Sequence, residues 1–266
     1  MRICTCTPLD PCSSAPVKTS AAQQEHSETK AKLLKRPLQF ACNDCWSWDA
    51  LNKGEEVCLT GNCLDTALFH PGWSNGTAGI RGTKRLDHST VCYWEIEVSH
   101  RVFGTSLMFG IGTEKSPLQL NWFSNLLGQD CHSYGLSHKG VLWHGGRPRD
   151  FCAPFAENVA TVIGLHFDGP RRTLRFYKDG ADLGPAWVGD LDLRGEVWYP
   201  MAASTAARSE MTLGLRKRSF SSLQDRCLAA LAENVVAQPT HDAKRRRIAG
   251  LPLPDGMKHE IWRRTS

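Results

Sequence analysis

The sequence predicts an all-β fold, an antiparallel β-sandwich that is followed by a small α-helical segment. Three observations support this prediction. Short strand-like runs recur between residues 41 and 220, turn residues such as Gly, Asn and Asp separate these runs, and eight of the nine tryptophans lie between Trp46 and Trp198. Many short strands with turn signals and little helical periodicity are typical of two sheets that bury a common core.

Residues 1–40 precede this region and differ from it in composition. They contain Ser, Thr, Lys, Gln and Pro without a sustained apolar period. Such a segment cannot bury enough apolar surface to offset the entropy of ordering, so we expect it to be disordered.

Strands are expected at six places in the sandwich. Residues 92–98 alternate between apolar and polar side chains, which is the period of a half-buried strand. The runs at 107–111 and 159–167 are almost continuously apolar, as in strands buried between sheets. A turn at 168–170 indicates a hairpin, and Asp179-Gly180 turns the chain again. The five further strands are predicted at 107–111, 159–167, 173–178, 198–203 and 211–215.

An amphipathic helix is expected at residues 222–234. Leu223, Cys227 and Leu231 recur every fourth residue and therefore share one face of a helix, and Ser222 can cap its N-terminus. A helix this short needs a surface to pack on. That surface is either the sandwich of the same chain or another protein.

A proline-rich segment follows that helix. It reads Leu251-Pro252-Leu253-Pro254 and begins 20 residues after Leu231. Proline fixes the backbone and removes a hydrogen-bond donor, so we expect a stiff, extended segment that presents its leucines to a partner.

These strings, in this order, resemble a known family. Four strings of the sandwich region resemble the SPRY (B30.2-like) domain: Tyr93 to Val98, Phe109 to Gly112, Leu165 to Gly180, and Trp198-Tyr199-Pro200. The helix resembles the elongin-binding motif of a SOCS box, and the proline-rich segment resembles its cullin box. The chain is thus similar to the SPRY domain-containing SOCS box family over residues 41–262.

The resemblance implies a domain organisation and a set of partners. The SPRY domain would occupy residues 41–220 and the SOCS box residues 221–262, with a basic linker at 241–248 and a cullin box at 251–261. Elongins B and C would bind through Ser222, Leu223, Cys227 and Leu231. A cullin with its RING protein, cullin 5 being favoured, would bind through Leu251, Pro252, Leu253 and Pro254. Glu260 stands where relatives usually have an aromatic residue, which bears on the strength and choice of the cullin contact.

The resemblance also implies where a target protein would bind. Loops at one end of a sandwich can vary without disturbing its core, so recognition is expected there. Relatives hold a short peptide at positions that match Phe69, Pro71, Trp73, Gly104, Thr105, Phe123, Thr205 and Ala206. Phe69, Phe123 and Ala206 stand where relatives have Arg, Tyr and Trp, which implies a different peptide preference. The alternative is that Phe69, Trp73 and Phe123 are mostly core residues and that other loops bind the target.

The charge distribution argues against a broad nucleic-acid-binding surface. Residues 241–266 hold seven Lys/Arg and three Asp/Glu, whereas the rest of the chain is nearly neutral. Within that basic segment, Lys244, Arg245, Arg246 and Arg247 form a solvated loop, a nuclear-import signal or a nucleic-acid contact. We therefore expect the chain in the nucleus and cytoplasm, and the absence of a run of about 18 apolar residues predicts no membrane span.

No catalytic constellation is evident in the sequence, and no cofactor is expected. His166 and Asp168 share a strand face, but no nucleophile with an oxyanion site accompanies them. Cys42-x-x-Cys45 is half of a zinc ligand set that Cys58 and Cys63 would have to complete, and buried packing explains such cysteines more simply.

The sequence therefore predicts a non-enzymatic adaptor. Its SPRY domain would capture a short motif in a target protein, and its SOCS box would recruit an elongin B/C–cullin–RING ubiquitin ligase, so that the target is ubiquitinated and degraded by the proteasome. The alternative is a SPRY protein-interaction module whose last helix packs back on the sandwich and recruits no ligase.

Overall fold

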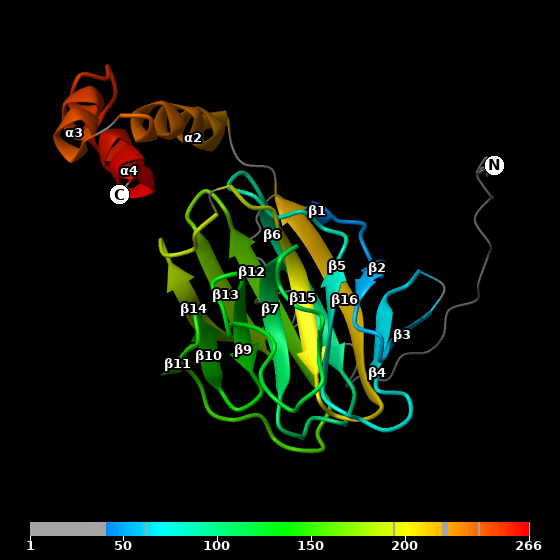
Figure 1. Ribbon diagram of the computed structural model, residues 1–266. Helices are drawn as coiled ribbons and strands as arrows, with labels where there is room; N and C mark the ends of the chain where they lie inside the picture. The colour runs from blue at the N-terminus through cyan, green and yellow to red at the C-terminus, as the bar shows by residue number, and fades with distance from the viewer. Residues whose placement is uncertain (1–40, 62, 194, 220–222, 239, 266) are drawn as a thin grey trace, which may run out of the picture.

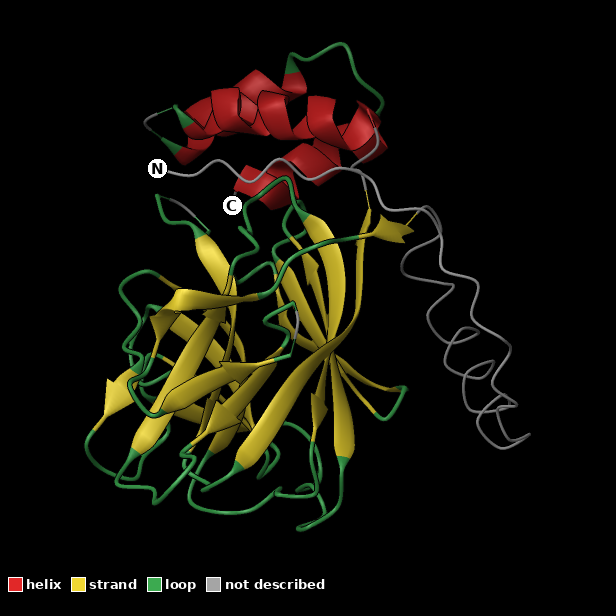
Figure 2. Cartoon of the chain, turned by 90° about the vertical axis from the view of Figure 1, so that its right-hand side faces the viewer, coloured by secondary structure: helices red, strands yellow, loops and turns green. Residues whose placement is uncertain are grey.

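The computed structural model describes residues 41–61, 63–193, 195–219, 223–238 and 240–265 (Figure 1). Residues 1–40, for which disorder was expected, lie outside the described residues, as does Ser222. The described part consists of two packed antiparallel sheets and a group of three helices (Figure 2). The expected β-sandwich with a small helical segment is therefore confirmed.

The first sheet has eight strands. In spatial order they are β14 (Ala181–Val188), β13 (Thr173–Lys178), β12 (Thr161–Asp168), β6 (Val91–Val98), β16 (Ser209–Ser219), β4 (Thr66–Phe69) and β3 (Val57–Thr60), and β1 (Ala41–Asn43) pairs with β16.

The second sheet also has eight strands and covers the first. In spatial order they are β11 (Arg147–Asp150), β10 (Val141–His144), β9 (Ser133–Ser137), β7 (Leu107–Thr113), β15 (Trp198–Ser204), β5 (Thr77–Gly82) and β2 (Trp48–Lys53), and β8 (Gln119–Leu120) pairs with β5.

The core of the sandwich is rich in aromatic residues. Trp48, Trp94 and Trp198 are almost completely buried in one cluster, to which both sheets contribute. Each such side chain buries roughly 150–250 Å², so a few of them account for much of the apolar surface removed from water. This core holds the strand ends, and therefore the loops between them, in place.

Strand β6 is more deeply buried than its alternating sequence predicts. Tyr93 and Glu95 were expected to face solvent, but both are buried. The Tyr93 hydroxyl donates to Glu95 Oε1 (2.9 Å), and the Tyr93 ring makes an edge contact with Tyr177 of β13. The expectation of a half-buried strand is wrong at Tyr93 and Glu95, because β6 lies in the middle of its sheet and side chains of neighbouring strands cover this part of its second face. Glu97 is exposed, as expected.

The three helices pack on one another beyond one end of the sandwich (Figure 1). They are α2 (Leu223–Val236), α3 (His241–Ala249) and α4 (Asp255–Thr265). Their buried side chains form a cluster of their own, separate from the sandwich core: Leu228, Ala232, Val235, Ile248 and Ile261. Within the described residues, no helix has the length and apolar character needed to cross a membrane.

Candidate functional site

Four loops meet at the end of the sandwich opposite the helices. They comprise residues 70–76 after β4, 99–106 after β6, 121–125 after β8, and 205–208 between β15 and β16. We call them the loop cluster. They contain all the residues expected to bind a target except Phe69, which is the last residue of β4.

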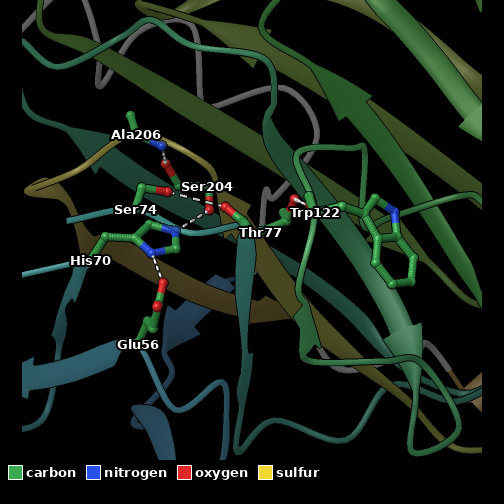
Figure 3. Close-up of polar contacts among 8 residues, drawn as sticks. Glu56, His70, Ser74, Thr77, Trp122, Ser204 and Ala206 are labelled. Carbon is green, nitrogen blue, oxygen red and sulfur yellow. Dashed lines mark hydrogen bonds and ion pairs between the residues drawn. The ribbon is translucent and has the colours of Figure 1, made fainter.

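Hydrogen bonds connect the 205–208 loop to two of its neighbours. The Thr205 hydroxyl lies 3.0 Å from both the backbone N–H and the carbonyl of Ser106. On the other side, the N–H of Arg208 donates to the His70 carbonyl (3.0 Å), and His70 Nε2 lies 2.9 Å from the Ser204 carbonyl (Figure 3). This loop therefore fixes the spacing between the 70–76 and 99–106 loops.

The 121–125 loop is attached through Thr77. The hydroxyl of this buried residue lies 3.1 Å from the Trp122 carbonyl and 2.7 Å from the Ser124 carbonyl (Figure 3). Thr77 begins β5, directly after the 70–76 loop. The structure thus brings together segments that lie far apart in the sequence, as the resemblance implied.

Five of the expected target-binding residues are accessible. Trp73 is 89% exposed and Phe123 is 52% exposed, so the alternative that they are mostly core residues is wrong for these two. The other three exposed residues are Pro71, Gly104 and Thr105. Gly104 has φ 97°, which favours glycine, and a Cβ there would lie 3.0 Å from the Thr205 hydroxyl.

The other three expected contacts need correction. Phe69 is completely buried in the sandwich core, because the β4 register turns it inward, so its side chain cannot contact a peptide. Thr205 and Ala206 are also buried. The Thr205 hydroxyl is engaged by Ser106, and the Ala206 N–H donates to the Ser204 hydroxyl (3.0 Å). These two residues shape the loop cluster and do not present side chains to a target.

Sequence reasoning missed Trp122, and it did not predict that His70 joins two loops. Trp122 is 61% exposed and precedes Phe123, so an exposed aromatic pair stands on one loop. The signal in the sequence that could have indicated Trp122 was the Trp–Phe pair itself, because two large aromatic residues are unusual in a polar loop. His70 is completely buried and has φ 47°, and nothing in the sequence marks a histidine as the residue that joins two loops.

Two arginines of the loop cluster donate to backbone carbonyls. Arg101 Nη1 donates to Ala207 (3.3 Å), and its guanidinium lies 5.8 Å from the centroid of the Phe103 ring. Arg208 Nε donates to Pro71 (3.4 Å). These contacts tie the loops together and place the Arg101 guanidinium beside the half-buried Phe103 ring.

Of the expected elongin-binding residues, Leu223, Cys227 and Leu231 fall on α2, which begins at Leu223. Cys227 is exposed, and Leu231 is half-buried at the edge of the helical cluster. The face of α2 that packs on α3 and α4 is the adjacent one, with Leu228, Ala232 and Val235. Cys227 therefore remains accessible beside a packed helical core.

The leucines of the proline-rich segment are placed differently from the expectation. Leu251 and Leu253 are half-buried and pack against the helical cluster, whereas Pro252 and Pro254 are exposed. The Pro254 carbonyl accepts the N–H groups of Met257 and Lys258 and so starts α4. The segment is a bend that closes the helical group, not an extended strip with presented leucines.

The basic run lies on a helix and not in a solvated linker loop. Thr240 caps α3, and its hydroxyl accepts the N–H of Ala243 (3.2 Å). Lys244 Nζ donates to the Thr265 carbonyl (3.2 Å), while Arg245, Arg246 and Arg247 are exposed. Three of the four expected import residues are therefore accessible, at consecutive positions of α3.

Three of the cysteines weighed as zinc ligands, Cys45, Cys58 and Cys63, are exposed. The expectation that buried packing explains these three is therefore wrong. Among the described residues, no group of three or more His, Cys, Asp or Glu side chains is arranged to hold a metal ion. Asp168 pairs with Arg171 Nη1 (2.8 Å), so the His166–Asp168 pair belongs to an ion-paired hairpin end.

Comparison with known proteins agrees with this architecture. The SPRY domain model matches residues 91–216. The chain is 35% identical to SPRY domain-containing SOCS box protein 3 of Xenopus laevis over 219 residues, which cover 81% of this chain and 57% of the relative. It is 28% identical to human SPRY domain-containing SOCS box protein 2, with 71% of both chains covered. The chain therefore spans somewhat more than half the length of the protein 3 relative.

A solved structure supports the fold independently. The PSpry domain of TRIM65 superposes with a TM-score of 0.50 at 16% identity, covering 69% of this chain and 98% of that domain. At this identity the likeness concerns the fold alone. Together with the match at 91–216, it confirms the SPRY fold expected from the sequence.

Proposed function

Because this chain belongs to the SPRY domain-containing SOCS box family, we propose that it is a non-catalytic substrate adaptor of an elongin B/C–cullin–RING ubiquitin ligase. In this role the loop cluster captures a target protein and the helical group recruits the ligase. The chain itself performs no chemistry. It raises the effective concentration of target lysines near a ubiquitin-loaded enzyme, and the target is then degraded by the proteasome.

The observation that carries this proposal is the accessibility of Cys227. A short amphipathic helix that packed entirely within its own chain would have no apolar position left for a partner. In α2, the buried side chains contact α3 and α4, while Cys227 is exposed and Leu231 is half-buried. We propose that elongin C binds α2 at Cys227 and at the exposed side of Leu231, and that elongin B joins through elongin C.

The distance between the two surfaces supports a bridging role. Strand β16 has 11 residues, starts at the loop cluster and ends shortly before α2. At about 3.3 Å per residue it separates the two ends by roughly 35 Å. Two binding events this far apart can occur together without steric conflict, as an adaptor requires.

We propose that the proline-rich bend contributes to cullin binding through Pro252 and Pro254, and that the cullin is cullin 5. Both prolines are exposed at the surface of the helical group. We also propose that the chain occurs in both nucleus and cytoplasm, with the exposed arginines of α3 acting in import.

Co-purification tests the proposal. The full chain, tagged and expressed together with elongins B and C, is purified at moderate salt, and we expect all three proteins in equal amounts. A chain that is folded, as shown by its near-ultraviolet circular dichroism, but that brings down no elongin would refute the adaptor role. It would instead favour a SPRY interaction module without ligase recruitment.

A further inference from the structure

A fifth loop lies at the same end of the sandwich as the loop cluster. It comprises residues 151–160, which connect β11 to β12, and every residue of it after Phe155 is exposed. Strand β12 begins at Thr161, which pairs with Val98, the last residue of β6. The 151–160 loop and the 99–106 loop therefore leave neighbouring strands at the same level.

One hydrogen bond joins this fifth loop directly to the loop cluster. The Asn158 N–H donates to the carbonyl of Val102 in the 99–106 loop (3.1 Å). Asn158 has φ 58°, in the left-handed region that asparagine tolerates better than most residues do. The hydrogen bond and this backbone conformation together hold the chain around Asn158 against the 99–106 loop.

A buried aromatic residue anchors the fifth loop from below. Phe155 is buried, and its ring stacks on that of Phe109 in β7, with the ring centroids 6.3 Å apart. The Phe155 N–H donates to the carbonyl of the buried His138 (2.8 Å), whose own N–H donates to the Leu107 carbonyl at the start of β7 (2.8 Å). The exposed residues 156–160 are therefore presented from a fixed base.

Together with three loops of the loop cluster, the fifth loop forms a row across the end of the sandwich. In the first sheet β4, β16, β6 and β12 are successive neighbours, and they carry the loops 70–76, 205–208, 99–106 and 151–160 in the same order. Three strand spacings of about 4.8 Å separate the first loop from the last by roughly 14 Å. An extended polypeptide rises about 3.3 Å per residue, so a segment that contacts both has at least about five residues.

The charges along this row are unevenly distributed. The loop cluster contains Arg101 and Arg208 and no Asp or Glu, whereas Glu157 is the only charged residue of the 151–160 loop. The Glu157 side chain is exposed, and within the described part of the chain no cation pairs with it, Lys139 of the adjacent turn included. A carboxylate fixed at one end of a row of loops can select a partner by charge, because complementary charges determine specificity more than they determine affinity.

We propose that the 151–160 loop is a fifth target-binding loop and that Glu157 is its specificity-determining residue. The partner is a segment of the target protein of at least about five residues, which carries Lys or Arg at the end beside this loop. A target with an acidic residue at that position is repelled and therefore excluded. The proposal rests on the proposed function in assigning these loops to target capture.

Charge reversal at Glu157 tests this assignment. The side chain is exposed, so its replacement leaves the packing of the sandwich intact, and E157K turns the attraction for a basic residue into repulsion. Glu55 is also exposed, in the β2–β3 turn at the same end of the sandwich, and this turn lies outside the row because β3 is the edge strand beyond β4. E55K makes the same change of net charge and is the matched control.

A phage library of random dodecapeptides is selected in parallel on the full-length wild type, E157K and E55K. The wild type and E55K should select a common motif of about five or more positions with Lys or Arg at one end, and E157K should replace only that residue by Asp or Glu. E157K should also bind the strongest wild-type peptide roughly fivefold or more weakly, and E55K should bind it as the wild type does. The proposal is overturned by wild-type peptides without a basic end, by an unchanged selection on E157K, by an equal shift in E55K, or by a library that yields no binder.

Elongin capture by the same three preparations reports on the adaptor role separately. All three should bring down elongins B and C alike, because the helices lie at the other end of the sandwich (Figure 1). Loss of the basic preference while elongin is still captured overturns this proposal alone, whereas a folded wild type that captures no elongin refutes the adaptor role.

Discussion

Cys227 and Leu228 are adjacent in α2 and face different surroundings: Leu228 is buried against side chains of α3 and α4, whereas Cys227 is exposed. The same turn of helix therefore carries one position that holds the helical group together and one that remains free. This division separates the stability of the helical group from its capacity to bind another protein.

The first prediction follows from that division. Cys227→Phe should reduce elongin C capture at least tenfold, because a bulky ring would prevent close approach to α2. The stability of the chain should change by no more than about 0.5 kcal/mol, since the position is exposed. Co-purification and thermal melting measure the two effects. Cys58→Phe, at an exposed cysteine on β3, is the control that should capture elongin normally.

Leu228→Ala should behave in the opposite way to Cys227→Phe. Removal of a buried leucine typically costs about 2–5 kcal/mol, here from the packing of the helical group. If Cys227→Phe destabilised the chain as much as Leu228→Ala does, Cys227 would have to be a packing residue, and the free surface on α2 would not exist.

The second prediction concerns Gly104 in the loop cluster. Gly104→Ala places a Cβ 3.0 Å from the Thr205 hydroxyl at a φ of 97°, so we expect a loss of about 1–3 kcal/mol of local stability and weaker target capture. Gly72→Ala is the matched control, since a Cβ there meets nothing within 4 Å. Chemical denaturation and hydrogen exchange of the 99–106 loop measure the difference. Equal effects of the two substitutions would show that the Gly104 conformation is unimportant.

The third prediction distinguishes exposed from buried aromatic residues. Trp122→Ala and Phe123→Ala should weaken target capture by about 2 kcal/mol each, as for exposed aromatic anchors, and leave the melting temperature nearly unchanged. Phe69→Ala should lower stability by about 3–5 kcal/mol, because Phe69 belongs to the core. A screen of a peptide library on residues 41–220, followed by affinity measurements with each variant, provides the test.

Much of the fold could be predicted because burial leaves a regular pattern in the sequence. β13 has the same bounds as the predicted strand at 173–178, and the Asp179-Gly180 turn after it has both residues at positive φ. In these places the local pattern and the tertiary environment agree. In β6 they do not, because Tyr93 is covered by Tyr177, a residue 84 positions further along the sequence.

The candidate site was harder to predict for a related reason. Motif order correctly placed Pro71, Gly104 and Phe123 in neighbouring loops, but it could not tell which side chains point outward. Phe69 precedes the exposed loop by one residue and is turned into the core by the register of β4. His70 takes part in long-range hydrogen bonds that leave no trace in the local sequence.

The fourth prediction concerns the basic helix α3. Changing Arg245, Arg246 and Arg247 together to Ala should lower the nuclear-to-cytoplasmic ratio of a fluorescent fusion, because these exposed side chains carry the charge that an import receptor would bind. Lys244 is left unchanged, since it donates to the Thr265 carbonyl and helps to hold α4. The triple change to Lys retains the charge and should retain the distribution. An unaltered ratio in the Ala variant would exclude an import role.

The fifth prediction is a pH dependence of stability at the β13–β14 turn. Burial by itself raises the pKa of Asp179, but hydrogen bonds from Lys178, the Val162 N–H and the Thr161 hydroxyl outweigh it and hold that pKa below its usual range. The folded state thus binds the proton less tightly than the unfolded state. The stabilisation is complete above the ordinary Asp pKa of about 4 and is lost as pH falls through the lower folded value.

Asp179→Asn tests this pH dependence without disturbing the turn. Asparagine tolerates the φ of 50° found here and keeps an oxygen that can accept from Val162 and Thr161, but it lacks the charge that attracts Lys178. We expect urea denaturation to show a less stable variant at pH 7 and a smaller difference from the wild type at pH 3. Asp150→Asn, at an exposed position on β11, should show little difference at either pH. An undiminished gap for Asp179→Asn at pH 3 would mean that turn geometry, and not the carboxylate charge, stabilises this hairpin.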